Sequence, residues 1–252
     1  MNRLLCCLLT AGLLAGAAAA ANKRVLVYTR NFTPDGKGYV HENIATSVEA
    51  IKKMGAEHGF DVDSSDDPKV FTAANLKRYA ALVFSNSNNV AFENDEQRAA
   101  FKSYVEGGGG FVGIHSATGS ERKWPDYWNI IGGHFLRHPK LQTFTVRVKD
   151  PKHPATRNLP ATFDWDDECY YTDHLAPDLH VLLVTDPAKL VDPQKAEYPG
   201  DRFGDSLPLA WSHEVGKGRA FYTALGHKKE HYSNPLLVNQ ILGGIQWAAR
   251  IK

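Results

Sequence analysis

The sequence is short of cysteine, of net charge and of long hydrophobic stretches. It has 3 cysteines in 252 residues, and its 29 Lys and Arg residues nearly balance 28 Asp and Glu residues, for a formal net charge of +1. This balance gives the chain no electrostatic means of capturing nucleic acid or an anionic membrane surface. The composition instead favours a small, weakly charged partner, and 43% hydrophobic residues suffice to bury a globular core.

The first 21 residues are predicted to be a signal peptide. Arg3 supplies a positive charge, an apolar run extends over 4–14, and the alanines at 17–21 offer several A-x-A cleavage frames. The run is shorter than the roughly 20 residues needed to span a membrane, so we expect cleavage after Ala20 or Ala21 and no remaining anchor. Residues 22–252 are then a single domain, periplasmic or secreted, with a formal net charge of 0 once Arg3 is removed. Its one cysteine, Cys169, excludes an intrachain disulfide.

Alternating strand and helix patterns predict an α/β fold. Buried-strand runs at 24–28, 79–84 and 110–114 alternate with helical patterns over 44–54 and 94–105. Elements in this order favour right-handed crossovers and a parallel sheet covered on both faces. Strand patterns over 207–213 and 219–225, and a helix beginning at Asn234-Pro235, complete the core.

Between about Gly132 and Pro208 the pattern is less regular. Thr143–Val148 and His180–Thr185 are strand-like, whereas 151–167 is predicted to be mostly loop. We interpret this region as insertions on the same sheet.

Polar side chains lie at or just after the ends of several predicted strands. His41 comes after the first strand, Asn86 after the run at 79–84 and His115 after the run at 110–114, and His213 and His227 stand at the ends of the last two strands. Ligands of doubly wound sheets bind beyond the carboxyl ends of the strands. We therefore expect these residues to meet in one crevice.

Five motifs resemble the ThuA-like, or trehalose-utilisation, family. They are Gly-Tyr-Val-His-Glu-Asn-Ile at 38–44, Gly-Gly-Gly-Phe-Val-Gly-Ile-His at 108–115, Ile-Gly-Gly-His-Phe at 131–135, Asp-Glu-Cys-Tyr at 167–170 and Gly-Lys-Gly-Arg-Ala-Phe-Tyr-Thr-Ala-Leu-Gly-His at 216–227. The resemblance extends from about Lys23 to Ala249. It implies a flavodoxin-like three-layer sandwich with a mostly parallel central sheet, as in the class I glutamine amidotransferase-like superfamily, with loop insertions.

One motif departs from the amidotransferase pattern. Where those enzymes have Gly-x-Cys-x-Gly, this chain has Gly113-Ile114-His115-Ser116-Ala117. Cys169 lies far along the sequence, and Ser116 is displaced by one residue from the position of the nucleophile. Cysteine-based acyl transfer is therefore disfavoured.

Acid–base chemistry is the alternative that the residues favour. His115 is the candidate base, because imidazole exchanges protons near neutral pH. Glu168 is the candidate acid, because nearby aromatic rings are expected to raise its pKa by desolvation, and His227 is the third catalytic candidate. Aromatic faces together with amide and carboxylate groups suit a neutral sugar, and we expect substrate contacts from His41, Asn86, His134, Asp167, Tyr170 and Trp211.

No cofactor is predicted, and a divalent metal such as zinc is kept as an alternative. His134 and His138, like His227 and His231, are spaced as in helical zinc half-sites, but neighbouring Gly and Pro residues predict loops for both pairs. Tertiary convergence gives the favoured set of metal ligands, which is His41, His115, His227 and Glu168.

The family resemblance also implies a reaction. ThuA-like proteins are linked with disaccharide use in which a partner sugar dehydrogenase oxidises a glycoside at its 3-position, and the ThuA-like protein is thought to act on or near the 3-keto sugar. The first hypothesis is therefore an exported sugar isomerase, lyase or hydrolase without a cysteine nucleophile. The other two are a metal-dependent amide or ester hydrolase and a non-catalytic carbohydrate-binding module.

Overall fold

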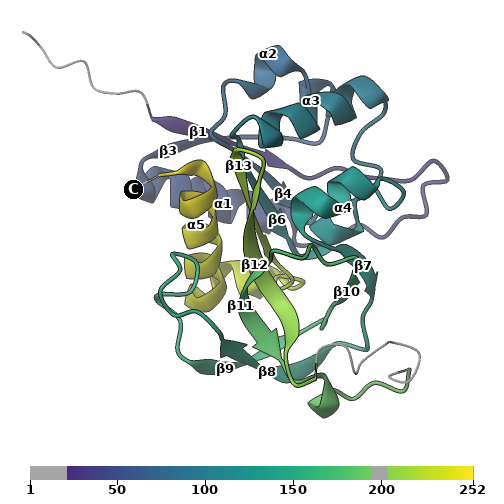
Figure 1. Cartoon of the computed structure of the whole chain (residues 1–252), viewed down its shortest axis with the longest axis vertical. Helices are drawn as coiled ribbons and strands as arrows, with labels where there is room; N and C mark the ends of the chain where they lie inside the picture. The colour runs from purple at the N-terminus through teal and green to yellow at the C-terminus, as the bar shows by residue number, and fades with distance from the viewer. Residues whose placement is uncertain (1–21, 195–203, 252) are drawn as a thin grey trace, which may run out of the picture.

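The computed structural model describes residues 22–194 and 204–251, and its main feature is one nine-stranded sheet with helices on both faces (Figure 1). The strand order is β3-β1-β4-β6-β13-β12-β11-β8-β9. The predicted signal peptide lies outside the described residues.

One half of the sheet is parallel. Every neighbouring pair in the order β3-β1-β4-β6-β13 is parallel. Numbered among themselves along the chain, these strands run 2-1-3-4-5 across the sheet, which is the flavodoxin-like order. The predicted flavodoxin-like α/β fold is thus confirmed, with strands at Lys23–Tyr28 (β1), Phe60–Ser65 (β3), Ala81–Ser85 (β4), Gly110–Ile114 (β6) and Gly218–Thr223 (β13).

The other half is antiparallel, and three of its four strands, β11, β8 and β9, come from the inserted region. Its strands are Leu207–Val215 (β12), His180–Thr185 (β11), Gln142–Val148 (β8) and Thr162–Asp167 (β9). The expectation that the insertions extend the same sheet is confirmed, but the prediction of loop over 151–167 is wrong at β9. This strand alternates Trp165 and Asp167, which are buried, with exposed polar residues, so its sequence resembles a polar loop.

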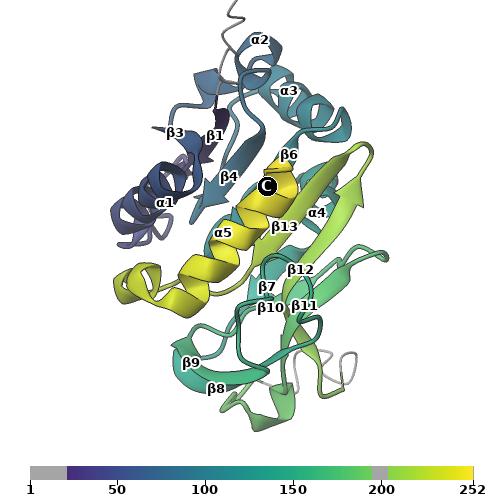
Figure 2. The same cartoon turned by 90° about the vertical axis from the view of Figure 1, so that its left-hand side faces the viewer.

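Helices cover the two faces of the sheet (Figure 2). Ile44–His58 (α1) and Pro235–Ala249 (α5) pack on one face, and Ala73–Leu76 (α2), Asp95–Glu106 (α3) and Pro125–Ile131 (α4) pack on the other. Successive side chains of β1 point to opposite faces of the sheet, so the core has two parts. Val25 and Val27 pack in the layer under α1 and α5, and Leu26 and Tyr28 pack in the layer on the opposite face. In the described part of the chain, no helix combines the length and the apolar character that crossing a membrane would require.

Short elements complete the edge where the parallel strands end. Two small ribbons pair Asn31–Phe32 (β2) with Asn88–Asn89 (β5), and His134–Arg137 (β7) with Tyr171–Asp173 (β10). Among the residues that the structure describes, short 3-10 helices lie at Pro68–Val70, His115–Gly119, Pro187–Lys189 and Lys229–Ser233. His134 begins a strand and His231 lies in a 3-10 helix, so the loops predicted at these histidines are wrong in part.

Candidate functional site

Four side chains from distant parts of the sequence meet beyond the carboxyl ends of the parallel strands. His115 follows β6, His227 follows β13, Glu168 follows β9 directly, and His41 lies in the segment between β2 and α1. One ligand atom from each of the four lies within 4.8 Å of all the others. The expected convergence of His41, His115 and His227 is therefore present, and Glu168 joins it.

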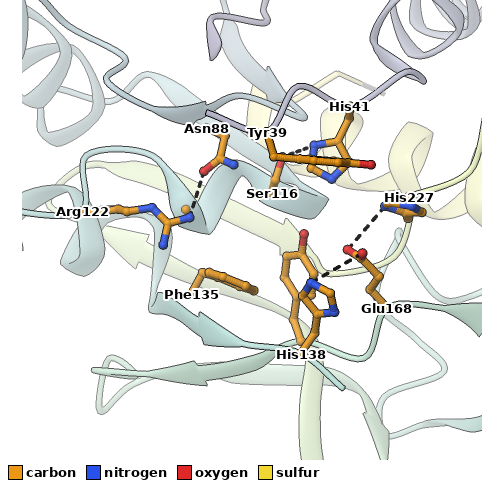
Figure 3. A pocket seen from close by; sticks show the side chains of 11 residues that line it. Tyr39, His41, Asn88, Ser116, Arg122, Phe135, His138, Glu168 and His227 are labelled. Carbon is orange, nitrogen blue, oxygen red and sulfur yellow. Dashed lines mark hydrogen bonds and ion pairs between the residues drawn. The ribbon is translucent and has the colours of Figure 1, made fainter. Parts of the chain in front are cut away.

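Three of these four side chains, His41, Glu168 and His227, border a cavity of about 400 Å³ (Figure 3). His41, Glu168, Tyr170 and His227 line this cavity, whereas His115 lies behind Tyr170, fully buried. The volume is within the range typical of small-molecule sites.

The local backbone fixes His115. Its φ of 52° is left-handed, a conformation that non-glycine residues adopt mainly where the surroundings impose it. Its Nδ1 lies 2.7 Å from the Ala224 carbonyl oxygen. Because that oxygen only accepts, Nδ1 carries the proton, and the lone pair of Nε2 faces the cluster, where the Tyr170 hydroxyl lies 2.9 Å away. Burial raises the pKa of Tyr170, which keeps this hydroxyl protonated.

Glu168 is the centre of the charge arrangement. Its Oε2 lies 3.4 Å from His115 Nε2. Figure 3 shows its other two ion pairs, of Oε2 with His227 Nδ1 at 3.3 Å and of Oε1 with His138 Nε2 at 3.5 Å. Burial raises the pKa of Glu168, but the facing His115 and His227 lower it by more, so that its net pKa is well below the usual range. The predicted rise is therefore wrong, since the rings that surround this carboxylate are imidazoles, and Glu168 is ionised.

The neighbouring histidines differ in protonation. The Glu168 carboxylate raises the pKa of His227 against the opposing effect of burial. Burial, reinforced by His115 and His227, lowers the pKa of His41 to about 3, so that His41 is neutral. The site thus holds an ionised carboxylate beside one histidine that accepts a proton readily and another that does not.

Asp167 positions the cluster from outside the cavity. Its Oδ2 accepts hydrogen bonds from the Gly226 amide and the Trp165 indole, both at 2.8 Å, and its Oδ1 accepts from the Glu168 amide at 2.8 Å and the His227 amide at 3.3 Å. Asp167 is fully buried and does not line the cavity. The predicted substrate contact of Asp167 is therefore corrected. Neighbouring residues of an extended chain point to opposite sides, so Glu168 lines the cavity and Asp167 points away from it.

Three further predicted substrate contacts also fall outside the cavity. Asn86 is fully buried and its amide donates to the Tyr232 hydroxyl at 2.6 Å. Trp211 lies in the middle of β12 instead of at a strand end, fully buried, and its indole donates to the Ile131 carbonyl at 2.8 Å. His134 pairs with Asp173 at 2.8 Å. His213, also predicted to lie near the site, pairs with Ala220 in the register of β12 with β13, towards the start of β13 and away from the site.

The sequence reasoning missed part of the cavity wall. Arg122 donates to Asn88 Oδ1 at 3.2 Å, and its guanidinium carbon lies 5.3 Å from the centre of the Phe135 ring. His138 follows β7, and its ring lies near that of Tyr170. In the sequence, Arg122 lies in a polar stretch after 115–117, and His138 was noted for its spacing from His134. Neither feature shows that the ribbon of β7 and β10 folds over the strand ends.

Comparison with known proteins assigns the family. The family model described as ThuA, trehalose utilisation, matches residues 24–248. The chain belongs to the ThuA family. The predicted resemblance is thereby confirmed, and the family supports a carbohydrate-related function in general terms.

Solved structures share the fold of this ThuA-family chain. A putative ThuA-like protein from Bacteroides uniformis is 25% identical with a TM-score of 0.72, covering 94% of this chain and 95% of that one. Another from Parabacteroides merdae is 19% identical with a TM-score of 0.68, covering 90% of each chain. A putative GMP synthase protein from Thermoplasma acidophilum is 11% identical with a TM-score of 0.51, covering 90% and 96% respectively, and is similar in fold alone. No curated protein matches the sequence.

Proposed function

We propose that this ThuA-family chain is an enzyme of carbohydrate metabolism that performs acid–base chemistry on a sugar, with a 3-keto-glycoside as its substrate. The observation that carries the proposal is the meeting of His41, His115, His227 and Glu168, within 4.8 Å of one another, at a cavity of about 400 Å³. Proton-transfer groups gathered at a small-molecule cavity are the arrangement that such chemistry needs.

The residues divide into a base and an acid. A ketone acidifies the neighbouring C–H bond, and the ionised Glu168 removes that proton while the electron pair moves onto the keto oxygen. His227 donates a proton to this oxygen to give an enediol. In isomerisation, Glu168 returns its proton to the former keto carbon while the neighbouring hydroxyl gives its O–H proton to His227. In elimination, the enediol O–H proton returns to His227, and the expelled glycosidic oxygen takes the proton held by Glu168 and leaves as an alcohol. His115 is held through Nδ1 by the Ala224 carbonyl, and its Nε2 accepts the hydrogen bond of the Tyr170 hydroxyl beside Glu168.

The cavity wall suits a sugar ring. Tyr39 and Phe135 offer aromatic faces for the apolar face of a pyranose, and Asn88 and Arg122 offer hydrogen-bonding groups for hydroxyls. Cys169 is fully buried, its pKa is raised by burial, and it does not line the cavity, which argues against a cysteine nucleophile.

The proposal includes a setting for the enzyme. An exported chain would meet glycosides outside the cytoplasm, and a sugar dehydrogenase would supply the 3-keto group that acidifies the C–H bond. The substrate is a small carbohydrate, and neither nucleic acid nor a membrane is needed for this reaction.

Glu168→Gln tests the proposal, because it removes the base and keeps the shape of the side chain. We expect turnover of 3-keto-glycosides, followed by NMR together with deuterium exchange beside the ketone, to fall roughly 100-fold or more. Glu214→Gln is the matched control, since Glu214 is exposed on β12, and it should retain activity.

Wild-type activity in Glu168→Gln would refute the catalytic assignment. Thermal stabilisation of the wild-type protein by the sugar, with neither exchange nor product, would instead identify a carbohydrate-binding module.

A further inference from the structure

We infer that the same centre is a binding site for one divalent first-row transition metal ion of the zinc type, held by His41, His115, His227 and Glu168. This inference deepens the proposed function and rests on it for the reaction, but the binding of the ion can be tested without any substrate. Four observations in the structure support it.

The first observation is the spacing of the ligand atoms. Zinc bonds to imidazole nitrogen and carboxylate oxygen are about 2.0–2.1 Å long, which sets tetrahedral ligand atoms about 3.3 Å apart. Glu168 Oε2 lies 3.4 Å from His115 Nε2 and 3.3 Å from His227 Nδ1. Both separations exceed the usual length of a charge-assisted hydrogen bond and match an edge of such a tetrahedron.

The second observation is a pair of buried ring nitrogens that form no hydrogen bond in the described residues, although His227 Nδ1 faces Glu168 Oε2 at 3.3 Å. The two nitrogens are His41 Nε2 and His227 Nδ1. His41 is 4% exposed, and its other nitrogen faces Ser116 Oγ at 3.3 Å. Buried polar atoms are normally satisfied, and a cation between these two nitrogens would satisfy both.

The third observation is the outer contact of His115. Histidines that bind metals usually donate their second ring N–H to a carbonyl or carboxylate, which fixes the tautomer. His115 does this through Nδ1 to the Ala224 carbonyl at 2.7 Å, and its Nε2 faces Glu168 Oε2 at 3.4 Å. The ligand nitrogen is thus oriented before any ion arrives, and a bound ion would take the lone pair that now accepts the Tyr170 hydroxyl at 2.9 Å.

The fourth observation is the chemistry of the donor set. Three imidazoles and one carboxylate, with no thiolate among them, suit zinc and its first-row neighbours better than calcium or magnesium. The cavity borders His41, His227 and Glu168 directly, so a sugar oxygen could reach a bound ion as an additional ligand.

A bound ion would change the roles of the residues in the proposed reaction. It would act as the electrophile for the keto oxygen, while Glu168 and His227 serve as ligands. His138 would then be an imidazole on the cavity wall outside the ligand set, with its Nε2 3.5 Å from Glu168 Oε1, placed to accept the proton from carbon.

The test uses the whole mature protein, stripped with a chelator and titrated with Zn²⁺ and, separately, with Co²⁺. We expect one equivalent to bind, measured by elemental analysis after gel filtration, with the visible absorption of four- or five-coordinate Co²⁺ and a raised melting temperature. His115→Asn keeps a residue that tolerates the left-handed backbone, and Glu168→Gln keeps the side-chain shape. Each should weaken Zn²⁺ binding by at least about 100-fold, while the exposed His58→Asn should bind as the wild type does.

Circular dichroism shows whether each variant is folded. The inference is overturned if folded wild-type protein binds no Zn²⁺ or Co²⁺, if both ligand variants bind as tightly as the wild type, or if the metal-free protein turns over 3-keto-glycosides at the full rate. The last result would leave the proposed function intact. Binding of one equivalent of Zn²⁺ without turnover of any 3-keto-glycoside would support the metal site and refute the proposed function.

Discussion

At the scale of single residues, Asp167 shows how one buried side chain can set a whole site. It accepts hydrogen bonds from the backbone amides of Glu168, Gly226 and His227. These amides belong to the two segments that carry the carboxylate and one of the histidines. The distance between Glu168 and His227 therefore depends on a residue that does not line the cavity.

Asp167→Asn should destabilise the protein and displace the site together. The Asn side chain would turn its NH₂ group towards N–H groups that now donate to the carboxylate. We therefore expect a loss of about 2–4 kcal/mol in the free energy of unfolding. Urea unfolding measures the loss, and turnover should fall with it.

Asp164→Asn is the matched control, because Asp164 lies on the same strand, is exposed, and accepts one hydrogen bond, from Thr145. It should change stability by less than about 0.5 kcal/mol. Equal effects of the two substitutions would contradict the positioning role of Asp167.

At the scale of elements, helix α5 approaches its surroundings closely because of two adjacent glycines. A Cβ on Gly243 would lie 2.1 Å from the Pro154 carbonyl oxygen, and one on Gly244 would lie 2.3 Å from the Phe221 ring. Phe221 is on β13, the strand that leads to His227. Gly244 thus lets the helix pack closely against the strand that leads to His227, and Gly243 lets it pack against the backbone between β8 and β9.

Gly243→Ala tests this close approach. Alanine favours a helix over glycine by about 1 kcal/mol, but the backbone contact forces the helix away, and we expect a net loss of about 2 kcal/mol. Denaturant midpoints measure it, with Asn239→Ala, at a partly exposed position of the same helix, expected to lose nothing. A Gly243→Ala protein as stable as the wild type would show that the helix can shift freely.

At the scale of the whole molecule, buried histidines make folding depend on pH. His153 is 6% exposed, packs near Trp247 and Phe221, and has a pKa lowered from 6.5 to about 4 by burial and by His180. Between these two values the unfolded chain binds a proton at this residue and the folded chain does not. The contribution of His153 is therefore fully present above about pH 6.5 and is lost as the pH falls towards 4.

Removing this histidine should flatten the pH dependence of stability. Urea unfolding of the wild type and of His153→Asn, at several values between pH 7.5 and pH 4, should show the wild type losing more stability, by up to about 3 kcal/mol. His58→Asn, at an exposed position, should behave as the wild type does. Parallel curves for His153→Asn and the wild type would contradict this explanation.

Much of the fold could be predicted because its core patterns are local. The apolar runs of β1, β4 and β6 and the caps at Asn94 and Asn234 are each readable within a few residues, and the carboxyl ends of parallel strands meet by topology. The strand β9 was missed because an edge strand with one buried face carries acidic residues at its exposed positions.

The sequence by itself determined that the chain carries ThuA-family motifs and that His41, His115 and His227 come after predicted strands. Only the tertiary structure decided that Trp211 is core, that Asp167 turns away while Glu168 turns in, and that Glu168 is ionised. The physical reason is that local sequence reports burial and periodicity. The direction of a side chain and the charges that face it depend on how strands distant in the sequence pair in the folded chain.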